Sequence, residues 1–200
     1  AAVDWSLSSA LDINRLEDFV SLPSPSVEPF AHQVDDAILF FRRLAPRGLI
    51  ADDVGLGKTI TAGLVARELL DRGRIENLLV VCPKSLVNQW QEELDSKFAI
   101  KAEVAVGGAF ANLDRYPFWI TSYPTARSKI EQIRARKFDL LLLDEAHALR
   151  NLYGTQAPPQ VAKAFERLMR DDSIRYCLML TATPIQNRLW DMFSLLEVLR

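Results

Sequence analysis

The sequence predicts an α/β protein built as a three-layer, doubly wound parallel sheet. Short apolar runs that are typical of strands alternate with stretches of helical spacing over most of the chain. The stretches 77–82 and 138–143 contain uninterrupted apolar runs, which indicate strands that are buried on both faces. Helices must then cover both sides of the sheet, and ligands should gather at the carboxyl ends of its strands.

Composition limits the kind of protein. A chain of 200 residues, 49% hydrophobic and 25% charged, can form one large domain or two small ones with a sizeable core. Its formal net charge of -2 excludes a globally basic nucleic-acid binder, so a nucleic-acid contact must come from a local positive stripe. No apolar run reaches the ~18 residues of a membrane span, and no signal peptide is visible. Cys82 and Cys177 lie in strand-like runs and are expected to be core residues.

The first part of the chain is expected to lie outside the sheet unit. Residues 7–20 have helical spacing. Residues 21–29 are rich in proline and serine, which indicates a loop or linker. We therefore divide the chain into an N-terminal helix with its linker, 1–29, and a main folded unit, 30–200. Because the chain lacks an initial Met and stops within a helical pattern, we expect it to be a piece of a longer protein.

Strands and helices alternate from residue 30 to the end. An apolar stripe that includes Val34, Ala37 and Phe41 predicts the first helix, which Pro46 stops. The later strands are short apolar runs, and the later helices have apolar residues three or four positions apart. The expected strands are 48–51, 77–82, 102–106, 118–121, 138–143 and 174–180, and the expected helices are 30–44, 58–72, 84–98, 125–136, 158–169 and 185–199.

A glycine-rich loop joins the first strand to the next helix. Its sequence, Gly-Leu-Gly-Lys-Thr, fits a phosphate-binding loop, because glycines let backbone N–H groups approach phosphate oxygens and the helix points its positive dipole end at them. Lys58 would supply a charge for the β- and γ-phosphates, and the Thr59 hydroxyl would ligate Mg²⁺. Asp52 stands where the full pattern has glycine, and a glycine turn with a solvated lysine is the alternative. The expected cofactor-binding residues of the loop are Gly55, Leu56, Gly57, Lys58 and Thr59.

An acidic pair follows the strand expected at 138–143. Asp144 is placed to hold Mg²⁺ and Glu145 to orient or deprotonate water, two roles that nucleotide hydrolysis requires. Two solvated acids at a strand end are the alternative, but four leucines that run into Asp-Glu-Ala-His favour a nucleoside triphosphatase. We therefore predict Lys58, Asp144 and Glu145 as catalytic residues. His147 either links the acidic pair to the next motif or is an ordinary loop histidine.

The strand expected at 174–180 runs into Thr-Ala-Thr-Pro. The hydroxyls of Thr181 and Thr183 are suited to relay the state of the γ-phosphate. Thr183 followed by Pro184 also fits a helix cap, and both interpretations can hold together. With His147, the two threonines form the predicted coupling set.

These motifs resemble those of the Swi/Snf-type ATPases of helicase superfamily 2. The strings Gly-Leu-Gly-Lys-Thr and Thr-Ala-Thr-Pro-Ile-Gln-Asn are particularly specific to that family. The resemblance spans about residues 30–200 and covers the first RecA-like lobe of the P-loop NTPase fold, so the second lobe would be absent from this chain. The segments that carry it are 49–59, 144–147 and 180–187, with 81–90 similar to the family's motif Ia and 120–123 to its motif Ib.

The resemblance implies a motor that uses ATP and Mg²⁺ to translocate along double-stranded DNA and to remodel protein–DNA complexes. Thr59 and Asp144 would hold the metal. Gln33 would read the adenine, with an exposed helix glutamine as the alternative. Ala182 and the wording of the glycine loop favour a bacterial or archaeal member, which would be cytoplasmic and associated with the nucleoid; a eukaryotic member would be nuclear.

Contacts to DNA are expected from loops at strand ends. Lys84 and Ser85 begin a helix after a proline, where a backbone phosphate would bind, and Ser122 follows the next apolar run. Arg127 and Lys129 can extend this stripe. For each lysine or arginine, a solvated surface charge is the alternative. Because phosphate contacts carry no base code, we expect sequence-independent, salt-sensitive binding to the DNA backbone.

Two further functions stay open from the sequence. One is a strand-separating DEAH-type RNA or DNA helicase, against which Thr-Ala-Thr-Pro-Ile-Gln-Asn argues. The other is a non-catalytic ATP-binding module. Such a module would lack at least one of the residues predicted to bind phosphate and metal or to activate water, and all four are intact here: Lys58, Thr59, Asp144 and Glu145. Because the family's second lobe supplies an arginine finger worth ~10³–10⁵ in rate, we expect this lobe alone, a monomer, to bind ATP weakly and hydrolyse it poorly. The expected partners are double-stranded DNA and the second lobe of the same protein, with no membrane.

Overall fold

The computed structural model describes residues 13, 18–20, 28–52, 57–152, 159–171, 173–183 and 189–200. Most of the helix expected at 7–20 and of the linker at 21–29 lies outside the described residues. The same is true of Gly55 and Leu56 in the glycine loop and of residues 184–188 after the last strand. None of the described helices is both long and apolar enough to cross a membrane.

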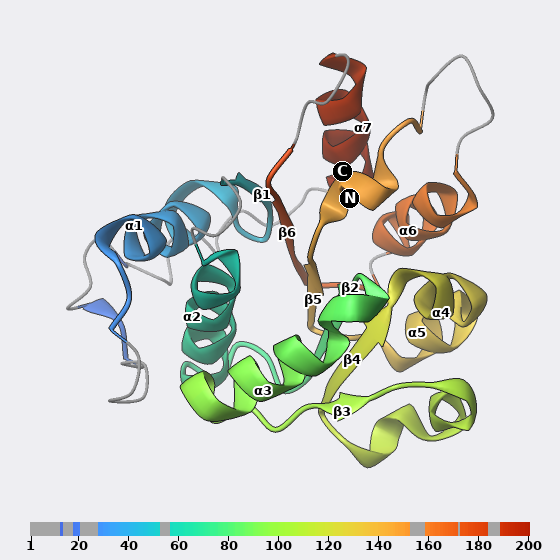
Figure 1. The fold of residues 1–200 in the computed structure, drawn as a ribbon, viewed down its shortest axis with the longest axis horizontal. Helices are drawn as coiled ribbons and strands as arrows, with labels where there is room; N and C mark the ends of the chain where they lie inside the picture. The colour runs from blue at the N-terminus through green and yellow to red at the C-terminus, as the bar shows by residue number, and fades with distance from the viewer. Residues whose placement is uncertain are drawn as a thin grey trace.

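Six parallel strands form one sheet in the order β1-β6-β5-β2-β4-β3 (Figure 1). After β1 the chain crosses to β2 near the middle, builds the β3 edge, and then returns to fill the positions between. The predicted α/β fold with a parallel sheet is confirmed. The strands are β1 (Arg47–Ala51), β2 (Leu78–Cys82), β3 (Glu103–Val104), β4 (Phe118–Ser122), β5 (Leu140–Leu143) and β6 (Tyr176–Thr181).

Helices cover both faces of this sheet and so complete the three predicted layers (Figure 1). The first three helices contribute to the apolar cluster on one face, and the last four contribute to the cluster on the other. The first group is α1 (Ala31–Leu39), α2 (Lys58–Asp71) and α3 (Val87–Phe98), and the second is α4 (Tyr123–Ser128), α5 (Ile130–Arg136), α6 (Gln160–Arg170) and α7 (Leu189–Leu199).

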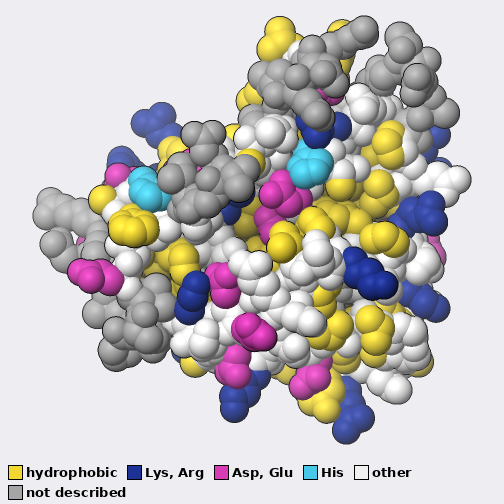
Figure 2. Space-filling view, in the orientation of Figure 1, with side chains coloured by type: hydrophobic (Ala, Val, Ile, Leu, Met, Phe, Trp, Pro, Cys, Tyr) yellow, Lys and Arg dark blue, Asp and Glu magenta, His cyan; other side chains and the backbone are white. Residues whose placement is uncertain are grey.

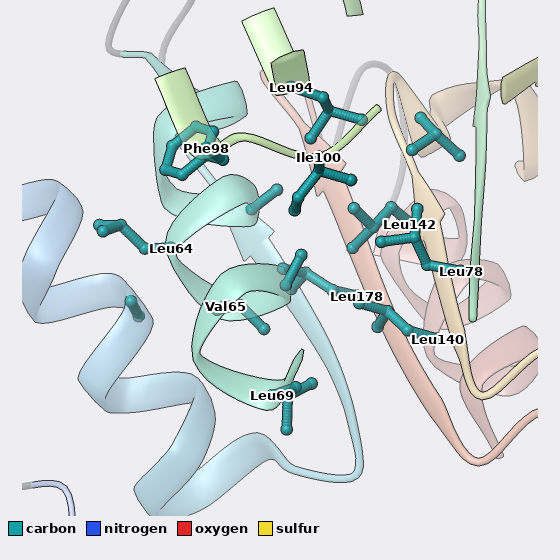
Figure 3. Close-up of a cluster of buried hydrophobic side chains, with 14 of the residues drawn as sticks. Leu64, Val65, Leu69, Leu78, Leu94, Phe98, Ile100, Leu140, Leu142 and Leu178 are labelled. Atoms are coloured by element: carbon teal, nitrogen blue, oxygen red, sulfur yellow. The ribbon is translucent and has the colours of Figure 1, made fainter. Parts of the chain in front are cut away.

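The sheet divides the core in two, and strand β2 shows why its sequence is apolar throughout. Leu78, Val80 and Cys82 belong to the cluster beneath α1–α3, whereas Leu79 and Val81 belong to the cluster beneath α4–α7. Successive side chains of a strand point to opposite faces, so a strand covered on both sides needs apolar residues at every position. The first cluster is drawn in Figure 3, with Leu64, Val65 and Leu69 of α2 opposite Leu78, Leu140 and Leu178 of the sheet.

Helices α2 and α3 pack closely on this face. The buried residues of α3 recur every three or four positions, and the last of them, Phe98, lies against Gly63 of α2. A Cβ atom at Gly63 would overlap the Phe98 ring, so the close approach of the two helices depends on glycine at this position.

Three elements differ from the sequence prediction. The helix expected at 125–136 is split into α4 and α5 at Lys129 (φ -121°, ψ 21°), where the Ser128 hydroxyl donates to the Thr125 carbonyl and competes with the helical bonds. The helix expected from Lys84 begins as a 3-10 turn, Lys84–Leu86, and becomes α-helical only at α3. The strand expected at 102–106 shortens to the edge strand β3, and an unexpected 3-10 segment, Gly107–Arg115, follows it.

Two apolar residues before the linker pack onto the sheet unit. Ile13 and Phe19 are buried in the same cluster as α1 and α2. The Phe19 ring meets Phe41 edge-on, with the ring centroids 6.1 Å apart. This part of the N-terminal segment therefore lies against the first face of the protein.

Polar contacts hold the same segment to α2. Glu68 is fully buried, and its Oε1 accepts hydrogen bonds from the Val20 N–H at 3.0 Å and from Arg72 Nε at 2.6 Å. Arg72 Nη2 also donates to the Asp18 carbonyl at 2.6 Å. Backbone groups of residues 18 and 20 thus bind to the ion pair between the buried Glu68 of α2 and Arg72, the residue that caps the helix.

Candidate functional site

The carboxyl ends of the central strands meet along one edge of the sheet. Ala51 of β1 lies beside Thr181 of β6 in the strand register. Asp144 continues the edge after β5, because its N–H donates to the Val81 carbonyl of β2 at 2.9 Å. The segments that follow β1, β5 and β6 therefore start next to one another, as parallel strands require.

The glycine loop ends in a backbone turn that glycine permits. Gly57 has φ +76° and forms the N-cap of α2. A Cβ atom at Gly57 would overlap Gln33 Nε2, so the loop and α1 touch at this point. Gln33 is only 3% exposed, and its Oε1 accepts from the Phe30 N–H at 3.0 Å. Gln33 is therefore buried against the loop and is not the exposed helix glutamine that the sequence left as an alternative.

Lys58 and Thr59 begin α2 directly after this turn. Lys58 is 9% exposed, and its Nζ donates to the Asp52 carbonyl at 3.0 Å. Thr59 is half-buried in the first turn of the helix. The side chains predicted to bind phosphate and metal thus start at the same sheet edge as Asp144, while Gly55 and Leu56 of the predicted set lie outside the described residues.

Asp144 is held by side chains from two other elements. Trp90 Nε1 donates to Oδ2 at 2.8 Å, and the Tyr123 hydroxyl donates to the Asp144 carbonyl at 2.8 Å. The Glu145 N–H donates to Oδ1 at 2.9 Å. Burial raises the pKa of the Asp144 carboxyl, whereas the bonds from Trp90 and Glu145 and the charge of Lys58 act to lower it. Directed donors thus hold both oxygens of Asp144 at the edge of the sheet where α2 also begins.

Glu145 leaves the strand in a left-handed backbone conformation, with φ +50°. Such a conformation is uncommon outside glycine and recurs at functional sites. Glu145 Oε2 lies 2.9 Å from His147 Nδ1, but the contact lacks hydrogen-bond geometry and is therefore electrostatic, strongest when His147 is protonated. Both side chains are partly exposed, and Figure 2 shows acidic side chains directly beside a histidine on this face.

The predicted coupling residues lie where β6 ends. Thr181 Oγ1 accepts from the Thr183 N–H at 3.2 Å. Arg150, which is buried, donates from Nε to the His147 carbonyl at 3.0 Å and from Nη1 to the Thr183 carbonyl at 3.4 Å. We call residues 144–147, which follow β5, the acidic turn. Within the described part of the chain, Arg150 thus joins the acidic turn to Thr183, while the His147 side chain contacts Glu145. The sequence reasoning missed Arg150, because a lone arginine in a loop carries no pattern.

A second pair of carboxyl groups lies beside the loop. Burial raises the pKa of Asp36 to about 6, helped by a hydrogen-bonding contact with the Asp52 carboxyl, by the Asp52 charge and by the charge of Asp35, and opposed by His32. The Oδ2 atoms of Asp36 and Asp52 are buried and have no hydrogen-bond partner among the residues that the structure describes. Because the Asp52 carbonyl accepts the bond from Lys58, this pair borders the predicted phosphate site.

The predicted DNA contacts lie just after β2 and at the end of β4. Lys84 and Ser85 are exposed in the 3-10 turn that precedes α3. Ser122 is 7% exposed, and its Oγ shares a hydrogen bond with Thr125 Oγ1 at 2.9 Å. Burial makes Ser122 less accessible than Lys84 and Ser85. The expectation that Lys84 and Ser85 open an α-helix is corrected, since α3 begins at Val87.

The donors at this edge fit a magnesium ion bound with a nucleotide phosphate. Mg²⁺ takes oxygen ligands and is usually held by one or two protein groups together with substrate phosphates. The carboxylate of Asp144 has lone pairs beyond the two that accept from Trp90 and Glu145. The half-buried Thr59 hydroxyl supplies a second oxygen, and the buried ammonium of Lys58 favours an anion beside it.

Comparison with known proteins identifies the family to which the chain is similar. The family model described as the SNF2-related domain matches residues 32–200. The chain is 36% identical over 179 residues to the protein named "Uncharacterized ATP-dependent helicase YqhH" of Bacillus subtilis (strain 168), which covers 88% of this chain and 30% of that protein. It is 36% identical over 177 residues to RNA polymerase-associated protein RapA of Actinobacillus pleuropneumoniae serotype 3 (strain JL03), which covers 78% of this chain and 17% of RapA. The chain therefore spans less than a third of the length of these relatives.

Solved structures show the same fold. The SWI2/SNF2 ATPase core of Sulfolobus solfataricus in complex with dsDNA matches with a TM-score of 0.73 and 24% identity, over 87% of this chain and 37% of that chain. The SWI2/SNF2 ATPase core domain of the same organism matches with a TM-score of 0.67 and 24% identity, over 87% and 36%. Taken with the family match over residues 32–200, these likenesses confirm the predicted resemblance: the chain belongs to the SNF2-related domain family.

Proposed function

We propose that this chain is the ATP-binding lobe of an SNF2-type motor that hydrolyses ATP, moves along double-stranded DNA and remodels protein–DNA complexes. One observation carries the proposal most strongly: Lys58, Asp144 and Glu145, which are far apart in sequence, lie at one carboxyl edge of a parallel sheet. The archaeal core with the same fold is described in complex with dsDNA, which supports DNA as the track.

In this proposal the loop and the first turn of α2 hold the triphosphate. The Gly57 turn brings backbone N–H groups to the phosphates, and Lys58 exchanges its bond to the Asp52 carbonyl for phosphate oxygens. Thr59 and Asp144 hold Mg²⁺, which neutralises developing phosphate charge when it is bound. Gln33, buried against Gly57, is near enough to the loop to read the adenine side of the nucleotide.

Hydrolysis requires a base next to the phosphates. Glu145 is the candidate, because its partly exposed carboxylate directly follows the proposed metal ligand Asp144, and a carboxylate can accept a proton from water. His147 lies within 2.9 Å of that carboxylate and would hold its orientation. Arg150 carries a change at the acidic turn to Thr183, through bonds to the carbonyls on both sides.

The DNA backbone would lie along the ends of β2 and β4. Lys84 and Ser85 are exposed there and suit phosphate contacts, and Ser122 adds a hydroxyl if Thr125 releases it. Such contacts give salt-dependent binding without sequence preference. We further propose that a second RecA-like lobe completes the catalytic cleft, so that the lobe alone binds ATP weakly and turns it over slowly.

The test uses the complete protein. We expect ATP hydrolysis to rise with double-stranded DNA, and a triplex-forming strand to be displaced while a duplex stays paired. Unwinding of the duplex would instead establish a strand-separating helicase. Absence of ATP hydrolysis with every nucleic acid, at normal ATP affinity, would leave a non-catalytic binding module.

A further inference from the structure

Two aromatic side chains from different elements donate hydrogen bonds to Asp144. Trp90 of α3 reaches carboxylate oxygen Oδ2, and Tyr123 at the start of α4 reaches the main-chain carbonyl, each at 2.8 Å. Both donors are buried, at 1% and 6% exposure. Asp144 is therefore clamped from both sides of β5, by side chains that belong to neither β5 nor the acidic turn.

The two donors are themselves fixed in place. Trp90 lies on the buried stripe of α3 with Leu94 and Phe98, in the cluster on the first face of the sheet. The Tyr123 ring meets Phe165 edge-on, with centroids 5.9 Å apart, in the cluster on the second face. Burial raises the pKa of the Tyr123 hydroxyl well above its usual value, so this group remains a donor. Trp90 and Tyr123 therefore link α3 and α4 directly to Asp144.

Both donors also follow closely in sequence on the residues proposed to contact DNA. The helix that carries Trp90 follows without a break from the turn that exposes Lys84 and Ser85. Tyr123 is the residue directly after Ser122. A hydrogen bond to a ligating carboxylate orients that ligand and tunes its affinity for the metal, and its removal typically costs ~10–100-fold in metal affinity.

We infer that Trp90 and Tyr123 are positioning residues for Asp144, and that through them DNA contact at the ends of β2 and β4 changes the metal affinity of the nucleotide site. The inference rests on the proposed function, because it takes Asp144 as the metal ligand and DNA as the partner. Neither aromatic residue touches the nucleotide in this scheme. They act only through the position of Asp144.

The decisive variant is Trp90→Phe, which keeps an aromatic ring and removes the N–H donor. In the complete protein, calorimetry would measure the affinity for adenylyl imidodiphosphate with Mn²⁺ and with EDTA, and the ratio gives the gain due to the metal. We expect Trp90→Phe to reduce this gain by ~10–100-fold and to leave the metal-free affinity unchanged. Tyr123→Phe should change the gain in the same direction.

Trp119→Phe is the matched control. Trp119 is also buried, at 3% exposure, and its Nε1 donates at 2.9 Å to the carbonyls of Leu113 and Tyr116, away from Asp144. It should lower the melting temperature about as much as Trp90→Phe without changing the metal gain. An equal metal gain in Trp90→Phe, Tyr123→Phe and the unchanged protein would overturn the positioning role. An equal loss in the Trp119 control would assign the effect to general destabilisation and overturn it as well.

Repeating the titration with saturating double-stranded DNA tests the coupling. We expect DNA to increase the metal gain of the unchanged protein and to have little effect on that of Trp90→Phe. The same DNA effect in both proteins, or none in the unchanged protein, would refute the coupling. Because the DNA-free titration needs neither turnover nor translocation, failure of the proposed motor function is distinguishable from failure of the positioning role.

Discussion

Two carboxylate sites border the same edge of the sheet and differ in their hydrogen-bond donors. Both oxygens of Asp144 accept an N–H, from Trp90 and from Glu145. The buried Oδ2 atoms of Asp36 and Asp52 have no donor within the described ranges. Burial raises the pKa of the carboxyl group in both Asp144 and Asp36, but at Asp144 the donors oppose the shift, whereas at Asp36 the neighbouring carboxyl adds to it.

The difference shows what a buried carboxylate needs if it is to bind a cation. Desolvation alone would favour a protonated acid that binds a cation poorly. Directed N–H donors keep Asp144 oriented and favour its charged form, whereas burial and the neighbouring Asp52 carboxyl favour the protonated form of Asp36. The first site is suited to Mg²⁺, and the second destabilises the fold when both of its carboxyl groups are charged. Three substitutions test this contrast.

The largest effect is expected on the Asp144 side, from Glu145→Gln in the complete protein. The amide keeps the size and the N–H bond to Asp144 but cannot accept a proton from water, so ATP turnover should fall by ~10²–10⁴-fold. ATP affinity, measured by calorimetry, should remain. Unchanged turnover in this variant would assign the water-activating role to another group. The site around Asp144 would then no longer be distinguished from the Asp36–Asp52 pair by a role in catalysis.

A smaller loss is expected where the two sites meet, at Lys58. Lys58→Ala removes a charged donor to phosphate and the bond to the Asp52 carbonyl, so ATP affinity should fall by ~10–100-fold and turnover should fall as well. Lys163→Ala, an exposed lysine on α6, is the control and should leave both unchanged. Equal ATP affinity in the two variants would place the phosphates elsewhere.

The smallest effect is expected from Asp36→Asn and depends on pH. The folded protein keeps a proton on Asp36 up to a pKa of about 6, whereas the unfolded chain releases it near 3.8, so this site costs stability progressively as pH rises from about 4 to about 6. Asparagine has no charge and can donate to Asp52. Above pH 6 the variant should therefore melt higher, by about 2–4 °C, with the gain vanishing near pH 4.

The matched control for this pH series is Asp35→Asn, which removes an exposed carboxylate from the same helix. The Asp35 charge makes the smallest of the contributions to the raised pKa of Asp36, so the melting temperature of this variant should rise far less above pH 6 than that of Asp36→Asn. Parallel curves for all three proteins between pH 4 and pH 8 would show that the pKa of Asp36 is not raised, and the two carboxylate sites would then differ only in their hydrogen-bond donors.

Local patterns in the sequence were enough to predict the three layers and the edge of the sheet at which the candidate site lies. The apolar run 140–143 had to be a strand covered on both faces, and parallel strands had to bring Lys58 and Asp144 to one edge. The family match and the sheet topology confirm the family and fold; the roles of the site residues stay proposals. No local pattern could predict hydrogen bonds between residues that are far apart in sequence. Trp90 and Asp144 are 54 residues apart and meet only through tertiary packing. The break at Lys129 was missed because Ser128 competes locally with a helical pattern that otherwise continues.

The attachment of residues 18–20 to α2 matters for anyone who shortens this protein. The natural place to cut, judged by its prolines, is the linker before residue 30. A version that began there would lose the Val20 backbone donor to the buried Glu68 and would bare the surface that Ile13 and Phe19 cover. This loss would destabilise α2, the helix that carries Lys58. We therefore expect the shortened protein to melt at a lower temperature and to bind nucleotide more weakly, although its sequence still contains every predicted site residue.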